Sequence, residues 1–195
     1  FDTPATLRAM EGWVASAAGE GAKLALFPEA YVGGYPKGLD FSTRFGVREP
    51  QGRETFRRYF ESAIALDGPE CERILDMARR HAIRIVVGVI ERLGSSLYCT
   101  VLFASPEGEL EAIHRKLMPT GSERLAWAQG DGSTLPVVDT GHGRVGAVIC
   151  WENYMPQLRL AMYAQGIEIY CAPTVDDRDT WQTAMRHIAY EGRTF

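Results

Sequence analysis

Strand-like and helix-like segments alternate along the whole chain, and this alternation restricts the fold more than any other feature. Residues 83–90 form a β-branched run that predicts a strand, whereas Leu7, Met10 and Val14 recur at helical spacing within residues 3–19. Helices and sheets must each bury an apolar face against another layer, so alternating elements favour an α/β layered class. No change in composition, repeat or low-complexity tract interrupts the pattern. We therefore expect a single domain.

Local signals place the other elements. Thr3 is suited to cap the first helix, with Pro4 in its first turn. Ser-Pro-Glu-Gly at 105–108 is a hairpin signal. Residues 29–51 form a long irregular loop rich in glycine and proline, and such loops are usually functional. The predicted strands are 23–27, 83–90, 97–104, 109–116, 136–139, 144–149 and 167–172, and the predicted helices are 3–19, 55–65, 69–81, 157–165 and 179–191.

Composition narrows the class of protein. The 195 residues are 46% hydrophobic and 24% charged with a net charge of −4, which fits a globular protein with one well-formed core. Neither a basic stripe nor an apolar run of spanning length is present, so we expect no nucleic-acid partner and no membrane partner. The 4 cysteines and the scattered histidines favour neither disulfides nor a metal site. With no signal peptide visible, this pattern predicts a cytoplasmic protein.

The segment 141–146 has the letters of a dinucleotide-binding glycine fingerprint, but its context differs. That fingerprint follows a strand and opens a helix, whereas a predicted strand follows here. A tight turn between two strands explains the glycines, so we expect no dinucleotide cofactor.

One cysteine has a setting suited to catalysis. The predicted strand 144–149 ends at Cys150, Trp151 and Glu152 follow at once, and a helical pattern starts at Pro156. A thiolate is a strong nucleophile when its pKa is depressed, and helix N-terminal amides favour negative charge. The alternative is a buried structural cysteine, which is common. That structural role fits the three other cysteines, which lie inside predicted helices or strands: Cys71, Cys99 and Cys171.

Three charged residues follow or lie near other strand ends. Glu29 comes after the strand 23–27, where apolar surroundings can raise the pKa of a carboxyl group and make it a base. Lys116 ends the strand 109–116 and could stabilise developing negative charge. Glu123 lies in the loop beyond. Each of them, taken alone, is more readily explained as a solvated surface residue.

Taken together and in this order, the motifs resemble those of the nitrilase branch of the carbon–nitrogen hydrolase superfamily. Phe27–Ala30 is similar to the family's first glutamate motif, His114–Thr120 to its lysine motif and Cys150–Glu152 to its nucleophile motif. The Cys-Trp-Glu form is typical of nitrilases rather than amidases. The resemblance covers nearly the whole chain and includes three further stretches: 33–38, 130–133 and 185–193.

The resemblance implies a fold and a set of roles. It implies a four-layer α-β-β-α sandwich spanning residues 1–195, truncated at both ends, and homo-oligomers built from dimers that often extend into spirals. Cys150 would be the nucleophile, Glu29 the general base and Lys116 the cation that stabilises the tetrahedral species. Glu123 would orient Lys116 or assist proton transfer. No metal or organic cofactor is implied.

The reaction implied is hydrolysis of a small-molecule nitrile to a carboxylic acid and ammonia. Three alternatives share the fold: a cyanide hydratase or dihydratase, an amidase, and an inactive structural subunit. We expect a closed pocket to shift the pKa values of Glu29 and Lys116 toward each other. Six residues are candidates for the substrate pocket: Tyr31, Tyr35, Trp127, Trp151, Glu152 and Tyr154. For each of the aromatic residues, a core or interface position would be an equally good explanation.

Overall fold

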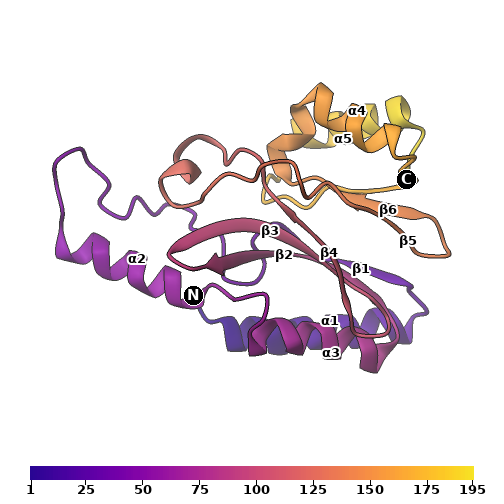
Figure 1. The fold of residues 1–195 in the computed structure, drawn as a ribbon, viewed down its shortest axis with the longest axis horizontal. Coiled ribbons are helices and arrows are strands. Elements are labelled where there is room, and N and C mark those ends of the chain that lie inside the picture. Colours follow the sequence, from indigo (N-terminus) through magenta and orange to yellow (C-terminus); the bar gives the residue numbers. More distant parts are fainter.

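Strand β2 (Arg84–Leu93) is apolar on both faces, which requires a layer on each side of its sheet. Ile85 and Val87 belong to a core that includes side chains of two helices, whereas Val86 and Ile90 belong to a core shared with a second sheet. Successive side chains of a strand point to opposite faces, so one strand makes both contacts. The computed structural model, which describes residues 1–195, is a four-layer α-β-β-α sandwich (Figure 1) and confirms the expected fold class.

Each sheet has its own pair of helices. The first sheet has the strand order β1-β2-β3-β4 and is covered by α1 and α3, and the second has the order β5-β6-β7 and is covered by α4 and α5 (Figure 1). The strands are β1 (Leu24–Leu26), β2, β3 (Ser96–Ala104), β4 (Leu110–Arg115), β5 (Val137–Asp139), β6 (Arg144–Ala147) and β7 (Ile169–Cys171). The helices are α1 (Thr3–Gly19), α2 (Pro50–Ser62), α3 (Pro69–His81), α4 (Pro156–Ala164) and α5 (Asp179–Gly192).

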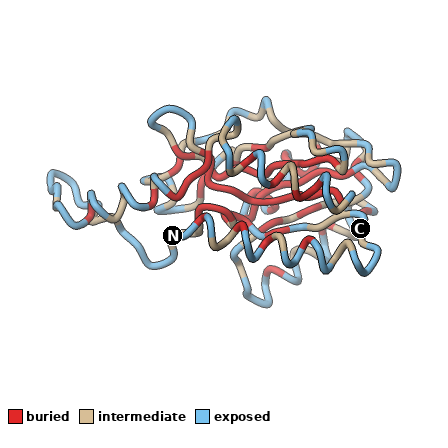
Figure 2. Tube along the Cα trace, turned by 90° about the horizontal axis from the view of Figure 1, so that it is seen from below, coloured by how far each residue is buried: buried red, intermediate tan, exposed pale blue.

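Strand direction brings several carboxyl ends to one edge of the sandwich. β1 runs parallel to β2, and β4 also runs in that direction because β2–β3 and β3–β4 are antiparallel pairs. In the second sheet β6 and β7 are parallel. Chain segments that follow β1, β4, β6 and β7 can therefore meet. Buried residues lie along the inner layers, and exposed residues lie on the outer helices and loops (Figure 2).

Most of the predicted elements are present, and two short 3-10 helices were not predicted: η1 (Gly121–Leu125) and η2 (Cys150–Tyr154). The predicted helix 55–65 begins earlier, at Pro50, because proline at the first helical position has a suitable φ and needs no hydrogen-bond acceptor. The hairpin at 105–108 is confirmed, with Gly108 at φ 85°.

The prediction that Thr3 caps the first helix was wrong. Asp2 is the cap, and its carboxylate accepts a hydrogen bond of 2.9 Å from the amide of Ala5. Thr3 is the first helical residue, and its hydroxyl instead donates to the carbonyl of Ser62 at 2.5 Å. A carboxylate one position earlier therefore takes the capping role, and Thr3 ties α1 to the end of α2.

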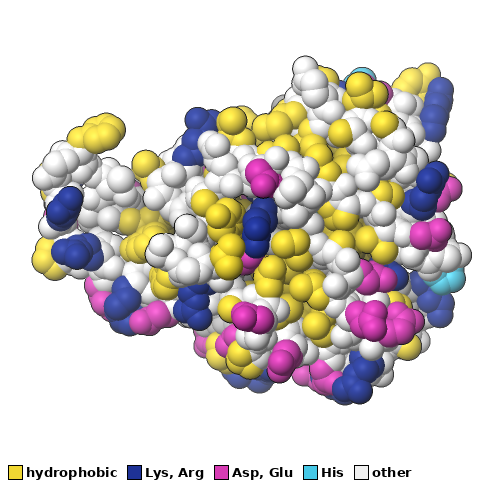
Figure 3. Space-filling view, in the orientation of Figure 1, with side chains coloured by type: hydrophobic (Ala, Val, Ile, Leu, Met, Phe, Trp, Pro, Cys, Tyr) yellow, Lys and Arg dark blue, Asp and Glu magenta, His cyan; other side chains and the backbone are white.

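The surface carries charges of both signs. On the face shown in Figure 3, Lys and Arg side chains are dispersed among Asp and Glu side chains rather than gathered in a stripe. No helix is both long enough and apolar enough to span a bilayer.

Gly88 allows the loop after β1 to lie directly on β2. A Cβ atom at this position would be 2.4 Å from the carbonyl oxygen of Pro28 and 2.7 Å from the amide nitrogen of Ala30. Both neighbours are backbone atoms, which cannot rotate away. The segment between Pro28 and Ala30 can hold its place only over a glycine.

We predict that Gly88→Ala lowers the free energy of unfolding by about 1–3 kcal/mol, because it overpacks a backbone contact. Chemical denaturation measures this change. The matched control is Gly12→Ala, since Gly12 lies in α1 with no atom within 4 Å of the place that a methyl group would take, and it should stabilise by roughly 0.5–1 kcal/mol. Equal effects of the two substitutions would contradict the close contact.

Candidate active site

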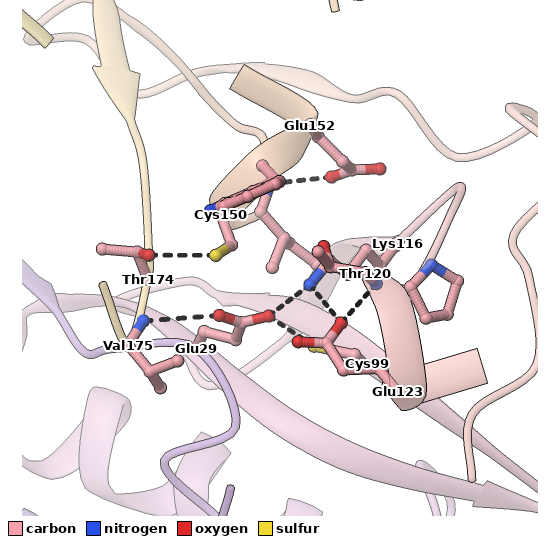
Figure 4. Close-up of polar contacts among 12 residues, drawn as sticks. Glu29, Cys99, Lys116, Thr120, Glu123, Cys150, Glu152, Thr174 and Val175 are labelled. Atoms are coloured by element: carbon pink, nitrogen blue, oxygen red, sulfur yellow. Dashed lines mark hydrogen bonds and ion pairs between the residues drawn. The ribbon is translucent and has the colours of Figure 1, made fainter. Parts of the chain in front are cut away.

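Four residues that are far apart in the sequence, at positions 29, 116, 123 and 150, meet between the two sheets. Glu29 follows β1, Lys116 follows β4, Glu123 lies on η1 and Cys150 follows β6 (Figure 4). Each of the three strand-end residues is at most 4% exposed. The structure thus brings together all the residues to which the sequence assigned catalytic roles, from segments on both sheets.

Glu29 is held by donors on both of its carboxylate oxygens. Oε1 accepts from Lys116 Nζ at 2.6 Å and from the thiol of Cys99 at 3.7 Å. Oε2 accepts from the amide of Val175 at 3.3 Å. The next residue, Ala30, has a φ of 51°, a left-handed turn that leads the chain away after the carboxylate has entered the site. These contacts fix the carboxylate with one oxygen toward Lys116 and the other toward the segment after β7.

Lys116 lies between two carboxylates. Its Nζ donates to Glu29 at 2.6 Å and to Oε2 of Glu123 at 2.9 Å, and it sits 5.6 Å from the centre of the Trp127 ring. Glu123 is fixed in turn, because Oε2 accepts from the amide of Thr120 at 2.6 Å and Oε1 accepts from the hydroxyl of Tyr35 at 2.8 Å. The arrangement orients the ammonium group and leaves it little freedom.

Cys150 occupies a strained turn at the start of η2. Its φ is 50°, a left-handed conformation that is uncommon for a residue with a Cβ. The side chain of Asn153 stabilises the turn by donating to the carbonyl of Val148 at 3.0 Å and to that of Cys150 at 2.7 Å. The sulfur atom accepts from the hydroxyl of Thr174 at 3.1 Å (Figure 4). The turn aims the thiol at the segment that follows β7.

Burial and charge set the ionisation of the cluster. Burial raises the pKa of Glu29, as expected, and the charge of Lys116 only partly offsets this effect. Burial alone would lower the pKa of Lys116, but the surrounding negative groups, the two glutamates among them, raise it above its usual range. The prediction that the two pKa values move toward each other was therefore wrong for the lysine. It has two carboxylate partners, so it stays charged.

The Cys150 thiol is not a resting thiolate. Burial raises the pKa of Cys150 to about 12, and the nearby negative charge of Glu29 is the second cause of this rise. The expectation of a depressed pKa at a helix start was wrong, because η2 is a single 3-10 turn and the site is shielded from water and net negative. A nucleophilic role for Cys150 would therefore require loss of its proton during attack, and the raised pKa of Glu29 suits this carboxylate to receive that proton.

A cavity of about 670 Å³ leads to the sulfur atom. Its lining comes from the loop after Tyr35, from η1, from Cys150 and Trp151, and from the segment after β7. Trp151 is 42% exposed, and its ring is held by a 3.3 Å hydrogen bond to Asp176 and by Arg178, whose guanidinium lies 5.5 Å from the ring centre. Of the six pocket candidates, Tyr35 and Trp151 line the cavity.

The other four pocket candidates lie elsewhere. Trp127 is buried in the core between the sheets and donates to the hydroxyl of Tyr59 at 2.8 Å. Tyr31 packs on Phe27 beside the core under α1 and α3, because the left-handed turn at Ala30 redirects the chain. Tyr154 packs between Trp151 and Trp181, with ring-centre distances of 5.6 and 6.0 Å. Glu152 is fully buried behind Cys150, where backbone amides bind its carboxylate.

Sequence reasoning missed several residues of the site. Cys99 was assigned a structural role, yet its thiol contacts Glu29 because it lies on the inner face of β3. Thr174 and Val175 follow β7, and their position after a strand was the only available signal. Tyr35 was a pocket candidate, but no local pattern indicated that its hydroxyl would donate to Glu123. No cluster of three or more His, Cys, Asp or Glu side chains has metal-binding geometry.

Comparison with known proteins identifies relatives over the full chain. A bifunctional nitrilase/nitrile hydratase from Nicotiana tabacum is 56% identical over 195 residues, and a protein called nitrilase 1 from Arabidopsis thaliana is 54% identical over 194 residues. Both matches cover 100% of this chain and 56% of the relative. The chain therefore spans little more than half the length of these relatives.

Solved structures and a family model agree on the fold. A variant of an amidase of the nitrilase superfamily from Nesterenkonia superposes with a TM-score of 0.78 at 21% identity, over 99% of this chain and 69% of that one. A nitrilase from Bradyrhizobium diazoefficiens is 58% identical over 182 residues, which are 93% of this chain and 57% of the relative. The model of the carbon-nitrogen hydrolase family matches residues 1–195. The chain belongs to the carbon-nitrogen hydrolase family, and its similar curated relatives are nitrilases.

Proposed function

We propose that this protein is a nitrilase, which converts a small-molecule nitrile and two waters to a carboxylic acid and ammonia. The observation that carries this proposal is the convergence of Cys150, Glu29, Lys116 and Glu123 beside one cavity, which Cys150 and Glu123 line. The Cys-Trp-Glu motif at 150–152 and the names of the relatives at 52–58% identity favour nitriles over amides.

Attack on the nitrile follows from the charges of the cluster. Sulfur of Cys150 bonds to the nitrile carbon as Glu29 takes the thiol proton, and electrons of the triple bond move to nitrogen. When Glu29 becomes neutral, Lys116 loses one of its two carboxylate partners, so more of its charge is available to the developing negative charge on nitrogen. Transfer of the proton to that nitrogen gives a neutral thioimidate and restores the Glu29 carboxylate.

Water then completes the reaction in two steps. Glu29 activates a water that adds to the thioimidate carbon, giving a tetrahedral species that carries hydroxyl, amino and sulfur groups. Loss of ammonia leaves an acyl-enzyme thioester, and a second water releases the acid and regenerates the Cys150 thiol. Loss of the thiol instead of ammonia would release an amide.

Amide formation is the second candidate activity. The relatives from Nicotiana tabacum are named as bifunctional nitrilase/nitrile hydratases, and both products come from the same tetrahedral species. Cyanide hydration and direct amide hydrolysis would use the same four residues. Assays of phenylacetonitrile, cyanide and phenylacetamide side by side separate them, and turnover of the amide alone would contradict the nitrilase proposal.

We also propose that the protein is a homo-oligomer of a reducing compartment such as the cytoplasm. Leu160 on α4 and Tyr190 on α5 are 65% and 70% exposed on the outer helix layer, which a second copy could cover. All four cysteines are free. Sedimentation velocity tests the oligomer, and a monomer at all concentrations would exclude it.

The first prediction that follows from the proposed function concerns the nucleophile. Cys150→Ala should lower ammonia release from a nitrile by about a thousandfold or more, because no covalent intermediate can form. Mass spectrometry of the parent protein with nitrile should find the adduct on Cys150. Cys171→Ala is the matched control and should keep full activity, since Cys171 is also buried but burial alone raises the pKa of its thiol, without a contribution from the charges of Glu29 or Lys116. Activity of Cys150→Ala at the parent level would exclude Cys150 as nucleophile.

The second prediction concerns pH. Glu29 must be ionised to accept the thiol proton, and its pKa is raised above 4.5, so kcat/KM should begin to fall above that pH as the solution is acidified. Below the apparent pKa of Glu29, the rate should fall about tenfold per pH unit. The acid limb should be absent in Glu29→Gln, whose residual rate lacks the titrating base. A parent profile that stays flat through pH 4.5 would contradict the role of Glu29.

A further inference from the structure

Glu152 is a fully buried carboxylate that takes no part in the reaction steps above. Its Oε1 accepts a hydrogen bond of 2.6 Å from the amide of Leu117. Its Oε2 accepts one of 2.7 Å from the amide of Ile149 and lies 2.9 Å from Nε2 of His114. These polar contacts of the side chain all lie within the protein, and Glu152 is not among the residues that line the cavity.

Each of the two amides belongs to a residue that is adjacent in sequence to Lys116 or to Cys150. Leu117 directly follows Lys116, at the end of β4 in the first sheet, and Ile149 directly precedes Cys150, after β6 in the second sheet. We propose that Glu152, paired with His114, is a positioning residue that fixes the lysine of one sheet relative to the nucleophile of the other. This inference rests on the proposed function, in which Lys116 must face a nitrogen on the carbon that Cys150 attacks.

The proton count of the pair explains why a glutamate is required. Nδ1 of His114 faces the carbonyl oxygen of Thr134, which can only accept, so this nitrogen carries a hydrogen. One further proton then lies between Nε2 and Glu152, as an imidazolium with a carboxylate or as a neutral ring with a carboxylic acid. In both forms the two oxygens of Glu152 remain acceptors for the two backbone amides. A side-chain amide offers only one oxygen and cannot do this.

The hydrogen bond between Glu152 and the amide of Ile149 matters because the adjacent turn at Cys150 is strained. Cys150 has a left-handed φ of 50°, which its own Cβ disfavours, so the neighbouring contacts must hold it. Asn153 holds the carbonyls of the turn, and Glu152 holds the amide that precedes the cysteine. If that amide loses its acceptor, the turn can relax and move the sulfur atom away from Glu29 and Lys116.

The test is the substitution Glu152→Gln in the full-length protein. The glutamine oxygen can accept from one of the two amides, while its NH₂ group faces the other N–H and leaves it without an acceptor. We expect kcat for a nitrile to fall roughly ten- to a hundredfold, which is the usual effect of one unsatisfied buried donor, with KM changed less than about threefold. Glu152→Asp, which keeps the charge but is one methylene too short to reach both amides, should also lower kcat.

A second measurement does not depend on the substrate. Iodoacetamide alkylates a thiol without building charge on a nitrile nitrogen, and Cys150 is the cysteine that lines the cavity. Its alkylation, followed by intact mass at several pH values, should be slower in Glu152→Gln and should follow a shifted pH profile, because the thiol no longer faces Glu29 correctly.

The matched control is Glu91→Gln. Glu91 is buried on β2 and accepts from the side chains of Thr100 and Arg115, but it binds no backbone amide beside a catalytic residue. It should lower Tm by an amount similar to Glu152→Gln and leave kcat and alkylation unchanged. Parent-like kcat and alkylation in Glu152→Gln would overturn the proposal, and so would kcat losses in both variants that simply follow Tm.

The outcomes also separate this inference from the proposed function. If the parent protein turns over no nitrile, the proposed reaction is wrong, whereas slower alkylation in Glu152→Gln alone would still support the positioning role. If the parent is active and Glu152→Gln is equally active, the reaction stands and the positioning role is wrong.

Discussion

The contact on which the site depends is the buried ammonium of Lys116 between the carboxylates of Glu29 and Glu123. Two unit negative charges surround one positive charge in a region shielded from water, at 2.6 and 2.9 Å. Removing Lys116 from this cluster would leave two buried carboxylates without a counter-charge, which is costly. The cluster therefore fixes β1, β4 and η1 relative to one another, and it also sets a net negative charge beside the Cys150 thiol.

The two sheets supply different parts of the site. The first sheet carries Glu29 and Lys116 at the carboxyl ends of parallel strands, and the second carries Cys150 after β6 and Thr174 after β7. Their relative placement depends on the apolar core between the sheets, to which Cys150 itself belongs. Glycine at position 88 is part of the same arrangement, because it lets the backbone of Glu29 lie directly on β2.

The sequence allowed the layered fold and the four converging residues to be predicted, and the reason is physical. Strand periodicity marks where strands end, and Glu29, Lys116 and Cys150 each follow such an end, where parallel strands bring their successors together. The resemblance to a known family then supplied their roles. Elements with strong local patterns, such as the helix 69–81, have the predicted bounds.

The features that could not be predicted depend on the direction in which a side chain points and on the number of charged groups around it, and no local sequence pattern encodes either. The inward direction of Cys99 depends on which face of β3 meets the second sheet. The side chain of Glu152 points into the protein interior because η2 turns within a few residues of the strand, whereas the predicted pocket role required it to point into the cavity. The pKa of Lys116 depends on how many carboxylates reach it, and the second one comes from η1, which was not predicted.

The charge state of the resting site links reactivity to substrate binding. Cys150 remains a thiol because a thiolate would add a second uncompensated negative charge beside Glu29, in a place where burial already disfavours it. Transfer of the thiol proton to Glu29 neutralises the carboxylate and leaves a negative charge on sulfur. The transfer becomes favourable when sulfur forms a bond to an electrophile, because the negative charge then moves onto the electrophile. A bound electrophile whose nitrogen lies near Lys116 satisfies this condition. The same carboxylate pair that keeps Lys116 charged thus keeps Cys150 protonated until its sulfur atom can bond to an electrophile.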